Sequence, residues 1–247
     1  MKPDRELDPR ERLVAHRGLA ARFPENTRAS VRGALDAGAR RVEIDAQLCA
    51  DQVPVLMHDG TLERLCGHPR RVADVSSAEL AGLRAAERAR FAAHFATEPV
   101  ATLADFARDI AATGAHAYVE LKRESIEHFG AEAVLAALEV PLRPLTGRAT
   151  LISFDLATLE HARASLPHPV GPVLTSGSEL ASARIAALSP SVIFCDHRKL
   201  PRGPLRAPAP LCVYEIASGA HARELAARGV ALFETFDVER LLRELAT

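Results

Sequence analysis

Eight short stretches rich in β-forming residues alternate along the chain with alanine- and leucine-rich stretches that have helical spacing. The predicted strands cover residues 12–17, 41–45, 117–122, 150–154, 171–175, 192–196, 211–216 and 231–235. Regular alternation of strands and helices is typical of a parallel sheet whose faces are covered by helices. Eight such units favour an α/β fold of the closed (β/α)8 type, the TIM barrel, and the open doubly wound sheet is the alternative.

Two of the helical stretches carry signals for where they begin and end. Thr27 can cap the first helix and Gly38 can end it, and Gly229 ends the stretch that begins at residue 217. The chain has 247 residues, and a barrel of this kind usually needs about 250. We therefore expect residues 1–247 to form one domain.

Residues 53–100 interrupt the alternation. They contain one more extended run, VPVLMHD, and then a polar, arginine-rich stretch with little periodicity. We expect a small insertion after the second strand, which lies over the top of the barrel. The proline-rich residues 201–210 are predicted to form a loop.

Charge and composition exclude several kinds of partner. The formal net charge is -1 and basic residues are scattered, so the chain lacks the basic patch that nucleic acids or anionic membranes require. Its N-terminus is charged, and no apolar run reaches the roughly 18 residues of a membrane span. We expect a cytoplasmic protein without stable membrane association, and four separated, reduced cysteines without a disulfide framework. The sequence carries no signal for a particular oligomer.

Charged side chains share one face on two of the predicted strands. Glu43 and Asp45 point the same way, as do Glu120 and Lys122, because successive side chains of a strand alternate between its faces. Carboxylates that face a barrel interior are costly without a cation. Oxygen ligands favour a hard ion, so we expect one divalent cation, Mg²⁺ or Ca²⁺, at Glu43, Asp45 and Glu120.

Two histidines and an arginine come at the ends of extended segments. His16 and Arg17 end the first strand, and His58 ends the additional extended run. In TIM barrels the active site lies at the C-terminal ends of the strands. Arg17, Lys122 and the metal would neutralise phosphate oxygens, while one histidine takes a proton from the nucleophile and the other protonates the leaving alkoxide. This set suits cleavage of a phosphodiester by water or by a neighbouring hydroxyl group of the substrate.

Four motifs in the order AHRGLAARFPENTRAS, GARRVEIDAQLCADQVPVLMHDGTLERLCG, VELK and ISFD carry a family resemblance. In order and spacing they resemble the glycerophosphodiester phosphodiesterase family, and its cytoplasmic bacterial members in particular. The resemblance implies a TIM barrel with a small inserted subdomain, a divalent metal, and hydrolysis of glycerophosphodiesters to glycerol 3-phosphate and an alcohol. The residue roles that it implies are acid and base for His16 and His58, phosphate binding for Arg17 and Lys122, and metal ligation for Glu43, Asp45 and Glu120.

The last two predicted strands depart from the family pattern. The family usually shows an aromatic-Thr-Val-Asn ending on strand seven and an Ile-Thr-Asp ending on strand eight. Here Glu215 and Ala217 stand at the Thr and Asn positions, and Phe236 stands at the Asp position. These ends face the substrate in the family, so the departures concern substrate identity. We expect Glu215 or Glu234 to add a carboxylate near the pocket.

Three further polar residues near the motifs are predicted to support the site. Glu25 and Asn26 are expected to hold the loop after the first strand. Asp59 either orients His58 or caps the turn beside it.

Two alternatives to this activity are a barrel that binds a phosphorylated ligand without catalysis and a lysophospholipase D-like enzyme. The pair of histidines argues against the first, and the lack of an apolar lip on the insertion argues against the second. The chain has no Trp and two Tyr, so we expect no strong preference for a choline head group.

Overall fold

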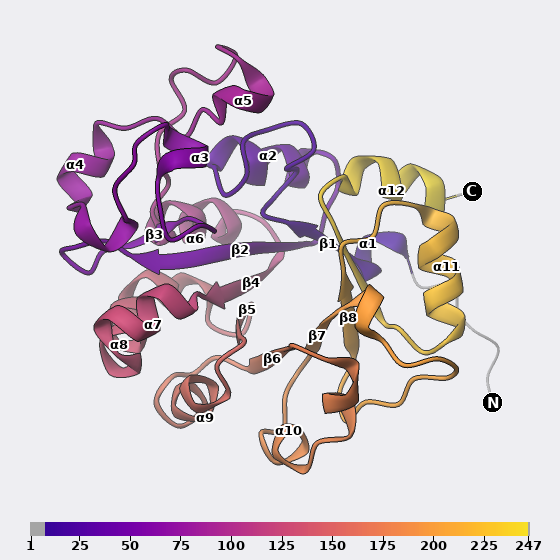
Figure 1. Ribbon diagram of the computed structural model, residues 1–247. Coiled ribbons are helices and arrows are strands. Elements are labelled where there is room, and N and C mark those ends of the chain that lie inside the picture. The colour runs from indigo at the N-terminus through magenta and orange to yellow at the C-terminus, as the bar shows by residue number, and fades with distance from the viewer. Residues whose placement is uncertain (1–7, 247) are drawn as a thin grey trace.

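All eight predicted strands belong to one closed sheet (Figure 1). The computed structural model describes residues 8–246. Its strands are β1 (Leu13–His16), β2 (Arg41–Leu48), β3 (Pro54–Leu56), β4 (His116–Leu121), β5 (Ala149–Ser153), β6 (Val170–Leu174), β7 (Ile193–Asp196), β8 (Leu211–Tyr214) and β9 (Leu232–Thr235). The order is β1-β9-β8-β7-β6-β5-β4-β2, and β1 also pairs with β2. Because these pairs are all parallel and the sheet closes, the fold is the TIM barrel and the open sheet is excluded.

Helices follow most of the strands and surround the barrel (Figure 1). They are α1 (Pro9–Arg12), α2 (Arg28–Asp36), α3 (Glu63–Cys66), η1 (Val72–Asp74), α4 (Ser77–Ala81), α5 (Arg88–Phe91), α6 (Leu103–Ala111), α7 (Arg123–Phe129), α8 (Ala131–Leu142), η2 (Arg143–Leu145), α9 (Leu156–Ser165), η3 (Gly177–Ala181), α10 (Ala183–Ala187), η4 (His197–Lys199), α11 (Gly219–Ala227) and α12 (Val238–Leu245). As predicted, the Thr27 hydroxyl accepts a hydrogen bond from the Ser30 amide at the start of α2, and Gly38 follows α2 with φ 96°.

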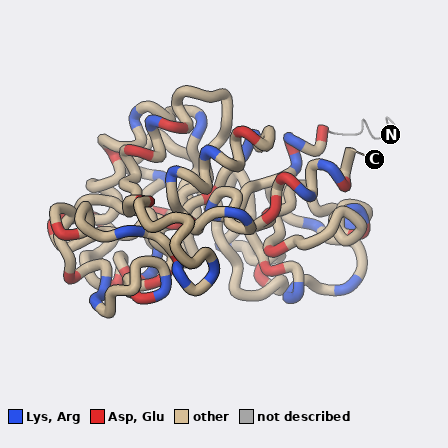
Figure 2. The backbone as a smooth tube through the Cα atoms, turned by 90° about the horizontal axis from the view of Figure 1, so that it is seen from above, with Lys and Arg blue, Asp and Glu red and all other residues tan. Residues whose placement is uncertain are grey.

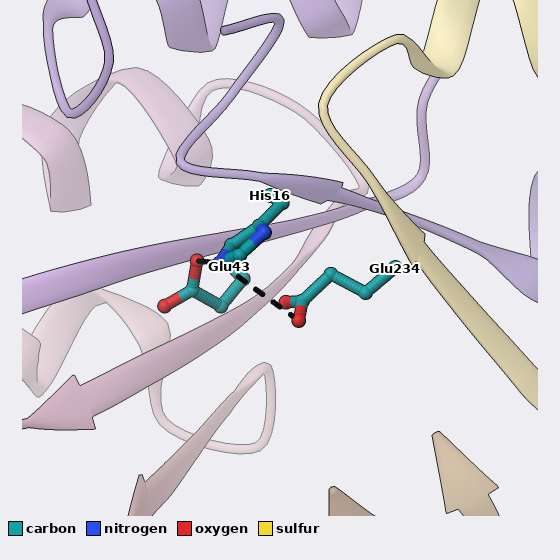
Figure 3. A group of neighbouring side chains, drawn as sticks. All are labelled: His16, Glu43 and Glu234. Atoms are coloured by element: carbon teal, nitrogen blue, oxygen red, sulfur yellow. Dashed lines mark ion pairs between the residues drawn. The ribbon is translucent and has the colours of Figure 1, made fainter. Parts of the chain in front are cut away.

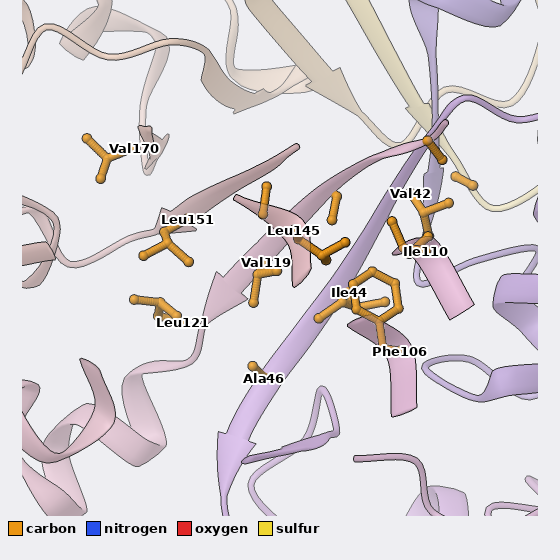
Figure 4. Close-up of a cluster of buried hydrophobic side chains, with 14 of the residues drawn as sticks. Val42, Ile44, Ala46, Phe106, Ile110, Val119, Leu121, Leu145, Leu151 and Val170 are labelled. Carbon is orange, nitrogen blue, oxygen red and sulfur yellow. The ribbon is translucent and has the colours of Figure 1, made fainter. Parts of the chain in front are cut away.

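Alternate residues of the strands face two different cores. Val42, Ile44 and Ala46 of β2 point outward and belong to the same buried cluster as Phe106 and Ile110 of α6 (Figure 4). Inside the barrel a smaller cluster contains Val14, Tyr118, Ile152, Val173, Val192, Phe194, Cys212 and Leu232. Residues two positions further along β1, β4 and β9 are His16, Glu120 and Glu234, so the strands change from apolar to charged toward their C-terminal ends.

The insertion between β2 and β4 contains secondary structure of its own. Its extended run forms β3, which pairs antiparallel with β2, and the arginine-rich stretch with little periodicity forms α3, η1, α4 and α5. Each of these helices has three to five residues, too few for a helical hydrophobic period to show in the sequence. The insertion has its own buried cluster, which includes Val55, Leu62, Val72 and Leu80.

Basic and acidic residues are interspersed along the described chain (Figure 2). Within residues 8–246 no helix is both long enough and apolar enough to cross a membrane. The four cysteines have free thiols, and Cys49, Cys195 and Cys212 are buried.

Candidate active site

The strand register brings the predicted site residues together at the C-terminal end of the barrel. His16 of β1 is paired in register with Glu43 of β2, and Asp45 of β2 is paired with Glu120 of β4. A cavity of about 260 Å³ opens at this end. The residues that line it are His16, Arg17, Glu43, His58, Glu120, Lys122, Ile152, Phe154, Val173, Phe194, Tyr214, Glu215 and Glu234. Asp45, the remaining predicted site residue, contacts two of them, Arg17 and Lys122.

Asp45 is held as a carboxylate by cations on two sides. Arg17 Nε lies 3.1 Å from Oδ2 of Asp45, and Lys122 Nζ lies 3.2 Å from Oδ1. Asn26 donates to Oδ2 at 2.8 Å and accepts from the Asp45 amide at 3.0 Å, so both ends of its amide fix this residue. Burial alone would raise the pKa of Asp45, but Lys122 and Arg17 hold that pKa well below its usual range.

Lys122 also pairs with Glu120. The distance from Nζ to Oε1 of Glu120 is 2.9 Å. Burial and the nearby Asp45 raise the pKa of Glu120. Burial opposes the charge of Lys122, yet Asp45 and Glu120 together raise the pKa of its ammonium group. The lysine therefore stays charged in the cavity wall, where an anionic phosphate could reach it.

Glu43 and Glu234 have fewer partners than the other two carboxylates. Each residue is 2 % exposed, and within the described residues the Oε1 atom of each accepts no hydrogen bond. Burial raises the pKa of both, and their carboxylate neighbours raise it further. Buried oxygens without donors are the ligands that a cation would satisfy.

The residues fit a divalent cation. One ligand oxygen each from Glu43, Asp45 and Glu120 lies within 4.8 Å of the others, and Oε1 of Glu43 has no hydrogen-bond partner among the described residues. Three carboxylates form an all-oxygen donor set, which suits a hard ion such as Mg²⁺ or Ca²⁺.

His16 lies between carboxylates and an aromatic ring. Its Nε2 is 3.8 Å from Oε2 of Glu43 and 4.0 Å from Oε2 of Glu234. The ring of Phe236 stacks on the imidazole, with centroids 4.4 Å apart and planes 10° apart. Burial, followed by the charge of Arg17, lowers the pKa of His16 well below its usual value, so the imidazole is neutral at pH 7.

His58 comes from the insertion and is oriented by its neighbour. Its Nδ1 lies 2.8 Å from Oδ1 of Asp59, so Asp59 orients the ring. Arg64 of α3 donates to both oxygens of Asp59 and to Glu25. The amide of Gln47 donates to the carbonyls of residues 57, 58 and 59, which ties this turn to the end of β2.

The turn after β1 places Arg17. Its guanidinium lies 3.0 Å from Oε1 of Glu25, and its amide donates to Oε2 of Glu43. The Ser30 hydroxyl donates to the Arg17 carbonyl, and Gly18 follows with φ 81°. A Cβ at Gly18 would lie 2.6 Å from the carbonyl carbon of Ser30, so only glycine fits this close approach.

Three side chains make contacts in the site that the sequence analysis did not predict. Phe236 stacks on His16, Glu234 lies beside it, and Arg64 holds Asp59. The sequence signal for two of them was the departure from the family pattern at the end of β9, and Arg64 had none. Of the departures at the end of β8, Glu215 lines the cavity, whereas Ala217 is exposed and is not among the lining residues. Phe154, Phe194 and Tyr214 add an aromatic wall that a count of Trp and Tyr did not predict.

The fold and the site define a (β/α)8-barrel protein with an arginine, a lysine, two histidines and a carboxylate cluster at the C-terminal end of the barrel. Residues 16–203 match the glycerophosphoryl diester phosphodiesterase family. The chain belongs to this family.

Curated relatives match parts of the chain. Glycerophosphodiester phosphodiesterase 1 of Bos taurus is 39% identical over 99 residues, which are 39% of this chain and 30% of that protein. The chain thus spans 30% of the length of this protein from Bos taurus and of its counterpart from Homo sapiens. A glycerophosphodiester phosphodiesterase of Caldanaerobacter subterraneus is 29% identical over 156 residues, 63% of each chain.

Solved structures share the fold along nearly the whole chain. A phosphodiesterase of Oleispira antarctica, solved in complex with the product sn-glycerol-3-phosphate, superposes with a TM-score of 0.82 at 23% identity and covers 96% of this chain and 97% of its own. A putative glycerophosphodiester phosphodiesterase of Galdieria sulphuraria superposes with a TM-score of 0.81 at 16% identity and covers 96% and 98%.

Proposed function

We propose that this chain hydrolyses glycerophosphodiesters to glycerol 3-phosphate and an alcohol, with a divalent cation and with His16 and His58 as the proton-transfer pair. One observation carries the proposal: both imidazoles line one cavity together with Arg17 and Lys122. Cleavage of a phosphodiester needs a proton acceptor, a proton donor and positive charge around the phosphate, and this cavity contains all of them.

The phosphate of the substrate is bound by Arg17 and Lys122. Both cations are already oriented by buried carboxylates, since Arg17 pairs with Glu25 and Asp45 and Lys122 pairs with Asp45 and Glu120. Positive groups that are held in place before the substrate arrives stabilise the negative charge of the transition state without having to reorganise. A divalent cation bound by Glu43, Asp45 and Glu120 would supply further neutralisation of a phosphate oxygen.

The two histidines differ in their surroundings, and this suits different roles. Among residues 8–246 no carboxylate lies within hydrogen-bond distance of the buried imidazole of His16, and its neutral ring can take a proton from the nucleophile. His58 is paired through Nδ1 with Asp59, which orients the ring so that it can donate a proton to the leaving alkoxide. Arg64 keeps Asp59 in this position.

The test is the release of glycerol 3-phosphate from a panel of glycerophosphodiesters, measured on protein stripped with a chelator and then supplied with Mg²⁺ or Ca²⁺. We expect release that requires the added metal and that falls about 10²- to 10⁴-fold in His16→Ala and in His58→Ala. The matched control is His161→Ala, since His161 is exposed on α9. A protein that binds metal and diester but releases no product would refute the proposal and favour a non-catalytic binding barrel.

A further inference from the structure

A second group of potential metal ligands lies beside the predicted cation site and differs from it in chemistry. It consists of His16 from β1, Glu43 from β2 and Glu234 from β9 (Figure 3). Their ligand atoms lie within 4.8 Å of one another, and all three residues are buried. Glu43 belongs to both groups, so the two sites would share one carboxylate.

The positive charge of the cavity is distributed unevenly. Asp45 and Glu120 are paired with Lys122, and Asp45 is paired with Arg17 as well. Glu234 has no Lys or Arg within ion-pair distance among the described residues, and Nε2 of the neutral His16 lies 4.0 Å from its Oε2. The uncompensated negative charge therefore lies between Glu43 and Glu234.

Unpartnered atoms point to a ligand in this position. Oε1 of Glu43 and Oε1 of Glu234 are buried and have no hydrogen-bond partner in the described part of the chain. Glu43 and Glu234 are each 2 % exposed, and both line the cavity. Two carboxylates in one buried place are costly unless a cation lies between them.

We propose that His16, Glu43 and Glu234 form a second metal site, and that this site takes Zn²⁺. Zn²⁺ is bound by imidazole nitrogens and by carboxylate oxygens, and a zinc site with three protein ligands leaves a fourth position for water. The site of Glu43, Asp45 and Glu120 has oxygen ligands alone and suits Mg²⁺ or Ca²⁺. Because only one of the two sites has a nitrogen ligand, the two sites prefer different metals.

Zinc at this site inhibits hydrolysis. A metal bound to Nε2 of His16 occupies the lone pair of that nitrogen, which then cannot accept a proton. This consequence rests on the proposed function of His16, whereas the binding of zinc itself does not.

The binding test uses the full chain, stripped with a chelator and then saturated with Mg²⁺. Zn²⁺ is titrated in competition with a chromophoric chelator, without substrate. We expect one bound zinc in the wild type and an at least 10-fold weaker affinity in Glu234→Gln, which keeps the shape of the side chain and removes its charge. The matched control is Glu215→Gln, which removes a carboxylate that lines the same cavity outside the cluster and should leave zinc affinity unchanged.

Equal zinc affinities in the wild type and Glu234→Gln, or no zinc bound by the Mg²⁺-saturated wild type, would overturn the proposal. The wild-type titration stands even if the variant does not fold, and circular dichroism establishes whether it does. In the wild type, ¹⁵N NMR of the histidines must show zinc shifting the Nε2 resonance of His16, and an unchanged resonance would also overturn the site.

Because zinc is measured without substrate, an inactive protein that binds zinc refutes only the proposed function. An active protein whose zinc affinity is the same in Glu234→Gln refutes only this inference.

Discussion

The ring of Phe236 lies flat on the imidazole of His16, with their centroids 4.4 Å apart and their planes 10° from parallel. Phe236 follows β9, and its backbone carbonyl accepts a hydrogen bond from the amide of Ala21 in the loop after β1. The same ring lies 5.6 Å from the guanidinium carbon of Arg17. One residue at the end of the last strand thus contacts both polar side chains that end the first.

Replacing Phe236 should slow hydrolysis more than it weakens substrate binding. An aromatic pair of this kind contributes about 0.5–1.5 kcal/mol, which corresponds to a loss of about 3- to 10-fold in kcat for Phe236→Ala. KM should change less, because the cavity-lining residues do not include Phe236. Steady-state kinetics measure both constants. Phe236→Tyr keeps the ring and should restore kcat, and a loss in KM alone would show that the ring does not position His16.

Removing the side chain of Asn26 should weaken metal binding. Asn26 makes two hydrogen bonds to Asp45 and has φ 56°, so Asn26→Gly deletes the amide without imposing strain on the backbone. Loss of such an outer partner typically lowers metal affinity about 10- to 100-fold. Calorimetric titration with Ca²⁺ or Mg²⁺ measures the effect. Gln52→Gly changes an exposed residue with φ 59° and should leave the affinity at its wild-type value.

Alanine at Gly18 should destabilise the fold strongly. The new Cβ would meet the Ser30 hydroxyl and lie 2.6 and 2.7 Å from the carbonyl group of that residue, and the backbone has φ 81°. Steric overlap and a left-handed conformation together should lower the free energy of unfolding by about 2–4 kcal/mol.

Gly67→Ala separates the two causes of that loss. Gly67 has φ 68°, but nothing lies within 4 Å of a Cβ built there, so only the conformational cost of about 1–2 kcal/mol applies. Urea denaturation of both variants measures the difference. Equal losses at the two positions would mean that the contact with Ser30 is relieved by a shift of the backbone.

His116 should make the stability of the protein depend on pH below neutrality. Burial, assisted by the charge of Arg41, lowers the pKa of His116 from 6.5 to about 4, and its Nε2 lies 3.0 Å from the Thr150 hydroxyl. The unfolded chain therefore binds a proton that the folded chain does not bind. The stabilisation from this difference is complete above pH 6.5 and is lost as the pH falls toward 4.

The measurement is the free energy of unfolding of the wild type and of His116→Gln at several pH values. Between pH 7 and pH 4 the wild type should lose up to about 3 kcal/mol more than the variant, because each pKa unit corresponds to 1.36 kcal/mol. Comparing the two proteins cancels the titration of all other groups that are unaffected by the substitution. Parallel curves would show that His116 keeps its ordinary pKa in the folded protein.

The local sequence pattern was sufficient to predict the eight strands and the faces of the charged residues on them. Apolar residues in short β-rich runs specify strands that are buried on both sides. The two-residue period of a strand places Glu43 and Asp45 on one face of β2, and Glu120 and Lys122 on one face of the chain at β4, independently of the rest of the fold. His16 could be predicted at the rim because it ends a parallel strand, and parallel strands end at one rim. His58 follows β3, which is antiparallel to β2, so this rule does not place His58.

The contacts of Glu234 and Phe236 were decided only by the tertiary structure. They stand more than 200 positions from His16, and no local period relates residues so far apart. Closure of the barrel pairs β9 with β1, and the register of that pairing places a carboxylate and an aromatic ring beside the imidazole. The register between β9 and β1 decides which of their side chains meet, and the packing of the whole barrel sets that register.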